Sequence, residues 1–252
     1  MALQDSILKL NGKVGDLSFF KTKNGYQARA KGGVSADRIK NDPGYKRTRE
    51  NMAEFGEVCS TSKKIRDVLR SMILQTHDTK MASRLTSRVY KMMKADTTSV
   101  RGERKVELSS FGLLRDFNFN DAAPLSNTLF VKPIPAIDRV TGVVDVTIPE
   151  IFSEVHLTSP KGATHFCMTA GAALVNLDEQ VEESLCLMAT SNFQAIKENL
   201  IETVLTSTLP PNATGVIMVV FGISFYQEVN TLMYPMNNGS YNALCTIAID
   251  LP

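Results

Sequence analysis

The second half of the chain is a series of short apolar segments, rich in β-branched and aromatic residues, with prolines between them. The segment GVVDVTIP alternates apolar and polar residues, whereas ATHFCMTAGAALV, ATGVIMVVFGISFYQEV and YNALCTIAIDL are more continuously apolar. Both patterns are typical of strands with one or two buried faces. Because no regular helices separate the segments, they predict an antiparallel β-sandwich rather than a parallel α/β sheet. One segment, NFQAIKENLIETVL, is compatible with either a short helix or a strand.

The start of the chain predicts a β-hairpin. The segments DLSFF and YQARA flank Lys23-Asn24-Gly25, and Asn-Gly is a strong hairpin signal because both turn residues accept positive φ angles. No acidic residue lies between residues 18 and 33, and four basic residues do: Lys21, Lys23, Arg29 and Lys31. Such side chains either form the solvated face of the ribbon or contact a negatively charged partner.

Residues 42–94 have a helical pattern. Asp42 before Pro43 is typical of a helix N-terminus, and apolar residues then recur at helical spacing as far as Ile73. A second helix, from about residue 78 to residue 94, carries a basic stripe on one flank: Lys80, Arg84, Arg88 and Lys91. We therefore expect an αα-hairpin.

Charge is divided unevenly along the chain, although the formal net charge is only +2. Residues 1–115 hold 24 Lys and Arg against 12 Asp and Glu, a balance of +12, whereas residues 116–252 hold 4 against 14, a balance of −10. We expect two domains: a basic hairpin and helical region over residues 1–105, and an acidic β-sandwich over residues 106–252. Such asymmetry bears on partners and association rather than on fold.

The sequence carries no recognised catalytic or metal-binding signature. It has no G-x-x-x-x-G-K-[ST] phosphate loop, no G-x-G-x-x-G motif and no H-E-x-x-H motif. The four cysteines are far apart with apolar neighbours, which predicts buried free thiols. His165 and Cys167 would share one face of a strand, but two side chains do not complete a metal site. We predict a non-enzymatic protein with no cofactor and no metal.

The sequence also bears on location. No stretch approaches 18 uninterrupted apolar residues, so we expect no membrane span. The first residues, MALQDSILKLNGKVGD, lack the apolar block of a signal peptide. We therefore expect synthesis in the cytoplasm without a signal peptide. The final location, including release as an assembled particle, is left open.

The chain contains three longer motifs: KNGYQARAKGGVSADRIKNDPGYKRTRENMAEFG near the start, IDRVTG in the centre, and FYQEVN followed by NAL near the end. These motifs resemble those of a family of uncharacterised proteins that is associated with Bacteroidota genomes and their mobile elements. The matches span nearly the whole chain in order, but Thr231 stands where this family has glycine. The resemblance implies one shared architecture, and it implies no activity, cofactor or catalytic residue.

The charge asymmetry favours a structural subunit that self-associates head to tail, as a filament or a virus-like particle. The candidate basic contacts are Lys21, Lys23, Arg29, Lys31, Arg84, Arg88 and Lys91, and the candidate acidic contacts are Glu179, Glu182 and Glu183. Three alternatives remain open. The two halves can neutralise each other within a monomer, the basic half can bind nucleic acid without sequence preference, or the sandwich can be an unrecognised hydrolase or sugar-binding domain.

Overall fold

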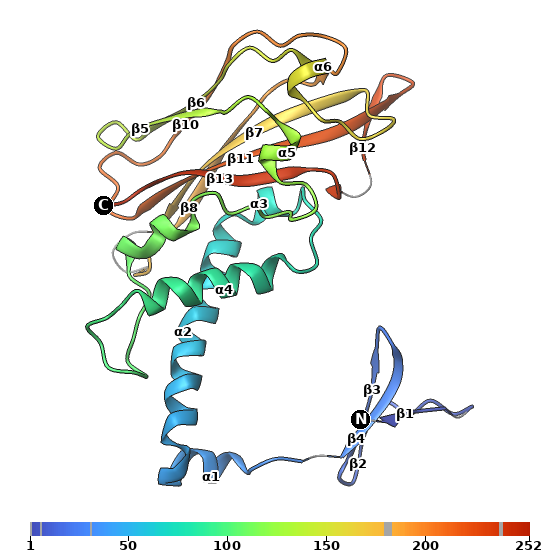
Figure 1. The fold of residues 1–252 in the computed structure, drawn as a ribbon, viewed down its shortest axis with the longest axis vertical. Helices are drawn as coiled ribbons and strands as arrows, with labels where there is room; N and C mark the ends of the chain where they lie inside the picture. The colour runs from blue at the N-terminus through green and yellow to red at the C-terminus, as the bar shows by residue number, and fades with distance from the viewer. Residues whose placement is uncertain (1, 6, 31, 179–182, 237–238) are drawn as a thin grey trace. The chain divides into compact units, whose positions relative to one another are not determined.

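The chain is a mixed α+β protein with several antiparallel sheets, shown as a ribbon in Figure 1, so the predicted fold class is confirmed. The computed structural model describes residues 2–5, 7–30, 32–178, 183–236 and 239–252. Two compact units make up the chain: unit 1 is residues 1–50 and unit 2 is residues 51–252. This boundary differs from the one expected after residue 105, because the helices of residues 51–94 share a core with the large sheet.

Unit 1 contains a four-stranded antiparallel sheet with the order β1-β4-β3-β2. Its strands are β1 (Ala2–Leu3), β2 (Gly12–Val14), β3 (Leu17–Thr22) and β4 (Gly25–Ala30). The predicted hairpin is β3–β4, and its turn places Gly25 at φ +104°, which a residue with a side chain rarely adopts. Strands β1 and β2, which the sequence pattern did not predict, extend the hairpin on its two sides.

After the four-stranded sheet, the chain continues with helices. Helix α1 (Ala36–Asn41) begins after Ser35, whose hydroxyl accepts a hydrogen bond from the backbone N–H of Arg38. The 3₁₀ turn η1 (Pro43–Tyr45) begins in the same way, because Asp42 accepts from the backbone N–H of Gly44. Helix α2 (Lys46–Val68) then leads into unit 2.

One layer of unit 2 is helical. Helix α2 ends at Val68, and α3 (Arg70–Ile73), α4 (Met81–Lys94) and the 3₁₀ helix η2 (Leu108–Leu114) follow. The αα-hairpin prediction is confirmed, because apolar side chains of these helices are buried against one face of the large sheet. These side chains are Val58, Ile65, Leu69, Met72, Leu85, Val89 and Met92. Met52 and Phe55, which the sequence pattern places in the same apolar stripe of α2, are instead exposed.

The middle layer is a six-stranded antiparallel sheet. Its two central strands, β7 (His165–Val175) and β11 (Val216–Val229), pair over the whole length of β7, from residue 165 to residue 175. The flanking strands are β8 (Leu185–Thr190), β9 (Gln194–Ala195), β12 (Leu232–Pro235) and β13 (Ala243–Asp250). Helices cover one face of the central strands and a second sheet covers the other, so both sets of alternating side chains are apolar.

The third layer is a three-stranded antiparallel sheet with the order β10-β6-β5. Strands β5 (Ile134–Asp138), β6 (Val143–Ile148) and β10 (Thr203–Thr208) alternate buried and more exposed residues. The buried side chains of β6 and β10 pack against alternate residues of β7 and β11, which makes the predicted sandwich. Two short helical turns, α5 (Leu125–Thr128) and α6 (Ser153–His156), lie in the connections.

The central motif IDRVTG closes one end of this sandwich. Arg139 donates hydrogen bonds to the carboxylate of Asp250 and to the backbone oxygens of Ala213 and Gly215. Gly142 has φ +79°, and a Cβ atom there would lie 2.1 Å from the backbone oxygen of Leu209. The motif therefore joins three chain segments and has a structural role.

Candidate functional site

One face of the sheet in unit 1 is apolar. Residues directly opposite each other on paired strands point to the same face. The register pairs Leu17 with both Val14 and Ala30, and it pairs Phe19 with Ala28. With Tyr26 and Ala2, which the same pairings place on this side, these side chains form what we call the apolar face. The apolar face consists of Ala2, Val14, Leu17, Phe19, Tyr26, Ala28 and Ala30, with Lys21 as its one charged member.

No layer buries this apolar face within the described part of the chain. None of the described residues of unit 1 is buried, and the side chains of Val14 and Leu17 are 63% and 43% exposed. A sheet with one apolar face is stable when that face packs on another element, and burying a Val, Leu or Phe side chain stabilises by about 1.5–3 kcal/mol. The apolar face is therefore the strongest candidate for an interaction surface.

The sheet of unit 1 carries basic side chains on both of its faces. Lys21 lies over the ring of Tyr26 at 5.6 Å, and on the opposite face of the sheet Arg29 lies over the ring of Phe20 at 5.8 Å. Lys23 is exposed in the hairpin turn, and the predicted contact Lys31 lies outside the described residues. Unit 1 holds 11 Lys and Arg against 5 Asp and Glu, a balance of +6, and unit 2 holds 17 against 21, a balance of −4.

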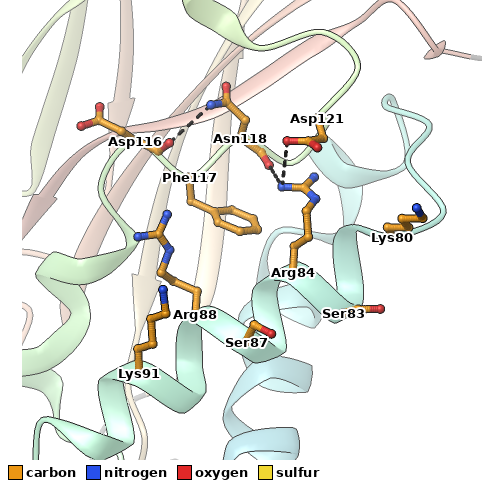
Figure 2. Close-up of a pocket in the computed structure, with 10 residues that line it drawn as sticks. All are labelled: Lys80, Ser83, Arg84, Ser87, Arg88, Lys91, Asp116, Phe117, Asn118 and Asp121. Carbon is orange, nitrogen blue, oxygen red and sulfur yellow. Dashed lines mark hydrogen bonds and ion pairs between the residues drawn. The ribbon is translucent and has the colours of Figure 1, made fainter.

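The basic stripe of α4 lines a groove of about 640 Å³ in unit 2. Figure 2 shows Arg84 directed toward Asn118 and Asp121, with Arg88 beside Phe117 and Lys91 further along the helix. The stripe was predicted, whereas the opposite wall of the groove was not. That wall is the segment from Asp116 to Asp121, which lies along β13 through hydrogen bonds of Asp116 and Phe117 with Thr246.

Arg84 is held by acidic and carbonyl groups of the same chain. Its guanidinium forms an ion pair with Asp78 and donates to the backbone oxygen of Asn118 at 2.8 Å. A carboxylate oxygen of Asp121 lies 3.8 Å from the Nη1 atom of Arg84. Burial acts to raise the pKa of Asp78, but the hydrogen bonds from Arg84 and from backbone N–H groups outweigh it and hold the pKa below its usual value. The charge of Arg84 is thus compensated internally.

Three basic side chains of the groove form no ion pair with a carboxylate among the described residues: Lys80, Arg88 and Lys91. Beside them, Asp116 and Asp121 supply two negative charges, once the Arg84–Asp78 pair is set aside. The hydroxyl groups of Ser83 and Ser87 lie on the α4 side of the groove. The groove is therefore a mixed polar surface with an excess of about one positive charge, a small excess for a surface that binds a polyanion.

The predicted acidic contacts are only partly described. Glu183 is exposed beside β8, whereas Glu179 and Glu182 lie outside the described residues. Sequence reasoning missed another acidic group, formed by Glu150 and Glu154 together with Glu198 and Glu202. Backbone hydrogen bonds between Ile151 and Leu200 bring these two segments together. No local sequence signal joins segments almost fifty residues apart.

The predicted pair His165 and Cys167 does lie on one face of β7, near the end of the sheet. The thiol of Cys167 donates to the backbone oxygen of Ser191 at 3.1 Å, and burial raises the pKa of this thiol. His165 lies 3.8 Å from Glu228. A buried, protonated thiol that donates to a carbonyl oxygen is typical of a structural cysteine and not of a nucleophile. All four cysteines are free thiols, with Cys167 and Cys245 buried and the other two half-buried.

Within the described ranges of the chain, no group of three or more His, Cys, Asp or Glu side chains is placed to hold a metal ion. The helices among the same residues are each too short or too polar to cross a membrane. Comparison with protein-family models, with curated proteins and with solved structures gives no significant match to this chain. The resemblance to a Bacteroidota-associated family therefore stays a prediction.

Proposed function

We propose that the protein is a structural subunit that self-associates head to tail, and that the apolar face of unit 1 is covered by another copy of the chain. The observation that carries this proposal is a four-stranded sheet with an apolar face and no buried residue among those described. Exposed apolar surface of this kind marks an interaction site in soluble proteins. A filament and a closed particle are both products of head-to-tail association.

Charge supports contact between unlike surfaces. Two copies of unit 1 facing each other would bring two balances of +6 together, whereas unit 1 against unit 2 pairs +6 with −4. Complementary charge raises the rate of association and selects the partner surface, while the buried apolar area supplies most of the affinity. The expected contact is therefore heterologous.

The groove on α4 bears on the alternative of nucleic-acid binding. Arg84 is compensated by Asp78, and Asp116 and Asp121 offset most of the remaining positive charge. Binding to a phosphate backbone depends on several uncompensated cations. The self-association proposal uses the apolar face as well as the charge, so we favour it.

The first prediction compares two neighbouring residues of β3. Leu17→Asp places a carboxylate on the apolar face, and Ser18→Asp places the same charge on the opposite face of the same strand. We expect Leu17→Asp to weaken self-association by at least about thirtyfold, because a carboxylate in an apolar contact loses hydration without a partner. Ser18→Asp should change it little. Sedimentation velocity of the full chain at several concentrations measures both.

Two results would contradict the proposal. One is a wild-type chain that sediments as a monomer at all concentrations tested. The other is equal weakening by the two substitutions, which would assign the effect to net charge and not to the apolar face. Thermal unfolding of unit 2 and the far-UV circular dichroism spectrum check that both variants remain folded.

A further inference from the structure

A second exposed apolar surface lies at the end of the three-stranded sheet in unit 2. Antiparallel pairing between β6 and β10 extends to a bridge between Ile151 and Leu200. The exposed apolar side chains next to this bridge are Phe152, Val155 and Ile201, and Phe130 lies beside them because its N–H donates to the backbone oxygen of His156. We call Phe130, Phe152, Val155 and Ile201 the acceptor patch.

These four side chains are exposed without a covering element among the described residues. Val155 is 69% exposed and Ile201 is 76% exposed, whereas the neighbouring Ile151 and Leu200 are in the core between the two sheets. Among the described aromatic groups, the ring of Phe152 contacts that of His156, at 5.6 Å between ring centroids and 66° between the ring planes. Several large apolar side chains on adjoining segments are more than the scattered exposure usual on a soluble surface.

Carboxylates surround the acceptor patch. Glu150 and Glu154 lie on one of its segments, and Glu198 and Glu202 lie on the other. All four are exposed, and none forms an ion pair with another described residue. The basic groups on these segments are Lys197 and, when protonated, His156. The local excess of negative charge is therefore about three.

The acceptor patch and the apolar face of unit 1 are complementary in two respects. Both expose apolar side chains, and the acidic surroundings of one match the basic balance of +6 of the other. Phosphate groups or another polyanion would be repelled by the four glutamates. Among surfaces described in this chain, unit 1 has the chemistry that the patch requires, which points to a second copy as its occupant.

We infer that the acceptor patch binds the apolar face of unit 1 from a second copy, an inference that rests on the proposed self-association and names its second surface. Head-to-tail association needs two unlike surfaces on each copy, and the acceptor patch supplies the second of them.

The test for this inference uses two matched valines. Val155→Asp places a carboxylate in the acceptor patch. The control Val140→Asp places a carboxylate outside the patch, at a valine in the β5–β6 turn that is 68% exposed. We expect Val155→Asp to weaken self-association by at least about tenfold, and Val140→Asp to leave it unchanged. Glu150→Gln with Glu202→Gln should slow association and reduce its dependence on salt.

Mixing two variants tests the pairing itself. The Leu17→Asp chain retains a functional acceptor patch, and the Val155→Asp chain retains a functional apolar face. Each should be monomeric alone, and their equimolar mixture should form dimers and nothing larger, because one surface of each copy remains blocked. Sedimentation velocity resolves a monomer, a dimer and a larger assembly.

The ways in which the two proposals can fail are distinguishable. If Leu17→Asp is monomeric while Val155→Asp assembles like the wild-type chain, the acceptor patch is wrong and the proposed function stands. If the wild-type assembly also stops at a dimer, two apolar faces contact each other directly and the head-to-tail arrangement is wrong as well. If the wild-type chain is itself monomeric, the proposed function fails and this inference fails with it.

Discussion

A single carboxylate, that of Asp96, stabilises the turn that follows α4. Asp96 follows α4, and one of its oxygens accepts hydrogen bonds from the backbone N–H and hydroxyl of Thr98 and from the backbone N–H of Ser99. The hydrogen bonds from Ser99, together with those from Thr98, hold the pKa of Asp96 well below its ordinary value of 3.8, although burial acts to raise it. The ionised form therefore stabilises the folded state.

Because the pKa of Asp96 is lowered in the folded state, the loss of stability caused by Asp96→Asn should depend on pH. A carboxyl whose pKa is lower in the folded state stabilises above the unfolded pKa, and that stabilisation is lost as pH falls from 3.8 toward the folded pKa. We expect Asp96→Asn to unfold at a lower temperature than the wild-type chain at pH 7, with a smaller difference at about pH 2.5. Thermal unfolding at both pH values measures this. An equal difference at both, or the same pattern in the exposed control Glu103→Gln, would contradict it.

At the scale of elements, two glycines illustrate opposite requirements. Gly142 has a positive φ and faces the backbone of Leu209, whereas Gly56 lies in α2, where an added Cβ atom would meet no atom within 4 Å beyond the helix's own backbone. The first glycine is needed for the turn that precedes β6. The second costs helix stability, since glycine in a helix is about 0.5–1 kcal/mol less favourable than alanine.

We therefore expect Gly142→Ala and Gly56→Ala to have opposite signs. Gly142→Ala should lower the free energy of unfolding by at least about 2 kcal/mol, because the new methyl group meets a backbone oxygen in a conformation that alanine rarely adopts. Gly56→Ala should raise it by about 0.5–1 kcal/mol. Urea unfolding of the full chain measures both, and a destabilised Gly56→Ala variant would count against this account of α2.

The elements with a strong local pattern could be predicted from the sequence. The Asn-Gly turn indicated the β3–β4 hairpin, the apolar stripe indicated α4, and alternation indicated β6. Strand β1 has two residues and β2 has three, so they depend on pairing partners and leave little trace in the sequence. The ambiguous segment NFQAIKENLIETVL forms strand β9 and the start of strand β10 and contains no helix. In β10, burial alternates, with Leu205 and Ser207 buried, which is the pattern of a strand with one face on the core.

For the molecule as a whole, the sequence predicted charge asymmetry but not the surfaces that carry it. The basic stripe was expected to contact a neighbour, yet Arg84 is compensated by Asp78 within the chain. The apolar face depends on the strand register, and the acceptor patch depends on the bridge between Ile151 and Leu200. Both are long-range pairings, which local periodicity does not determine.

The central claim is that another copy of this chain covers the apolar face. Its most direct test is the mass of the purified wild-type chain, measured by sedimentation velocity across a range of concentrations with no nucleic acid present. The account predicts species that are multiples of 27.7 kDa and that grow with concentration. A single 27.7 kDa species over the whole range would contradict it.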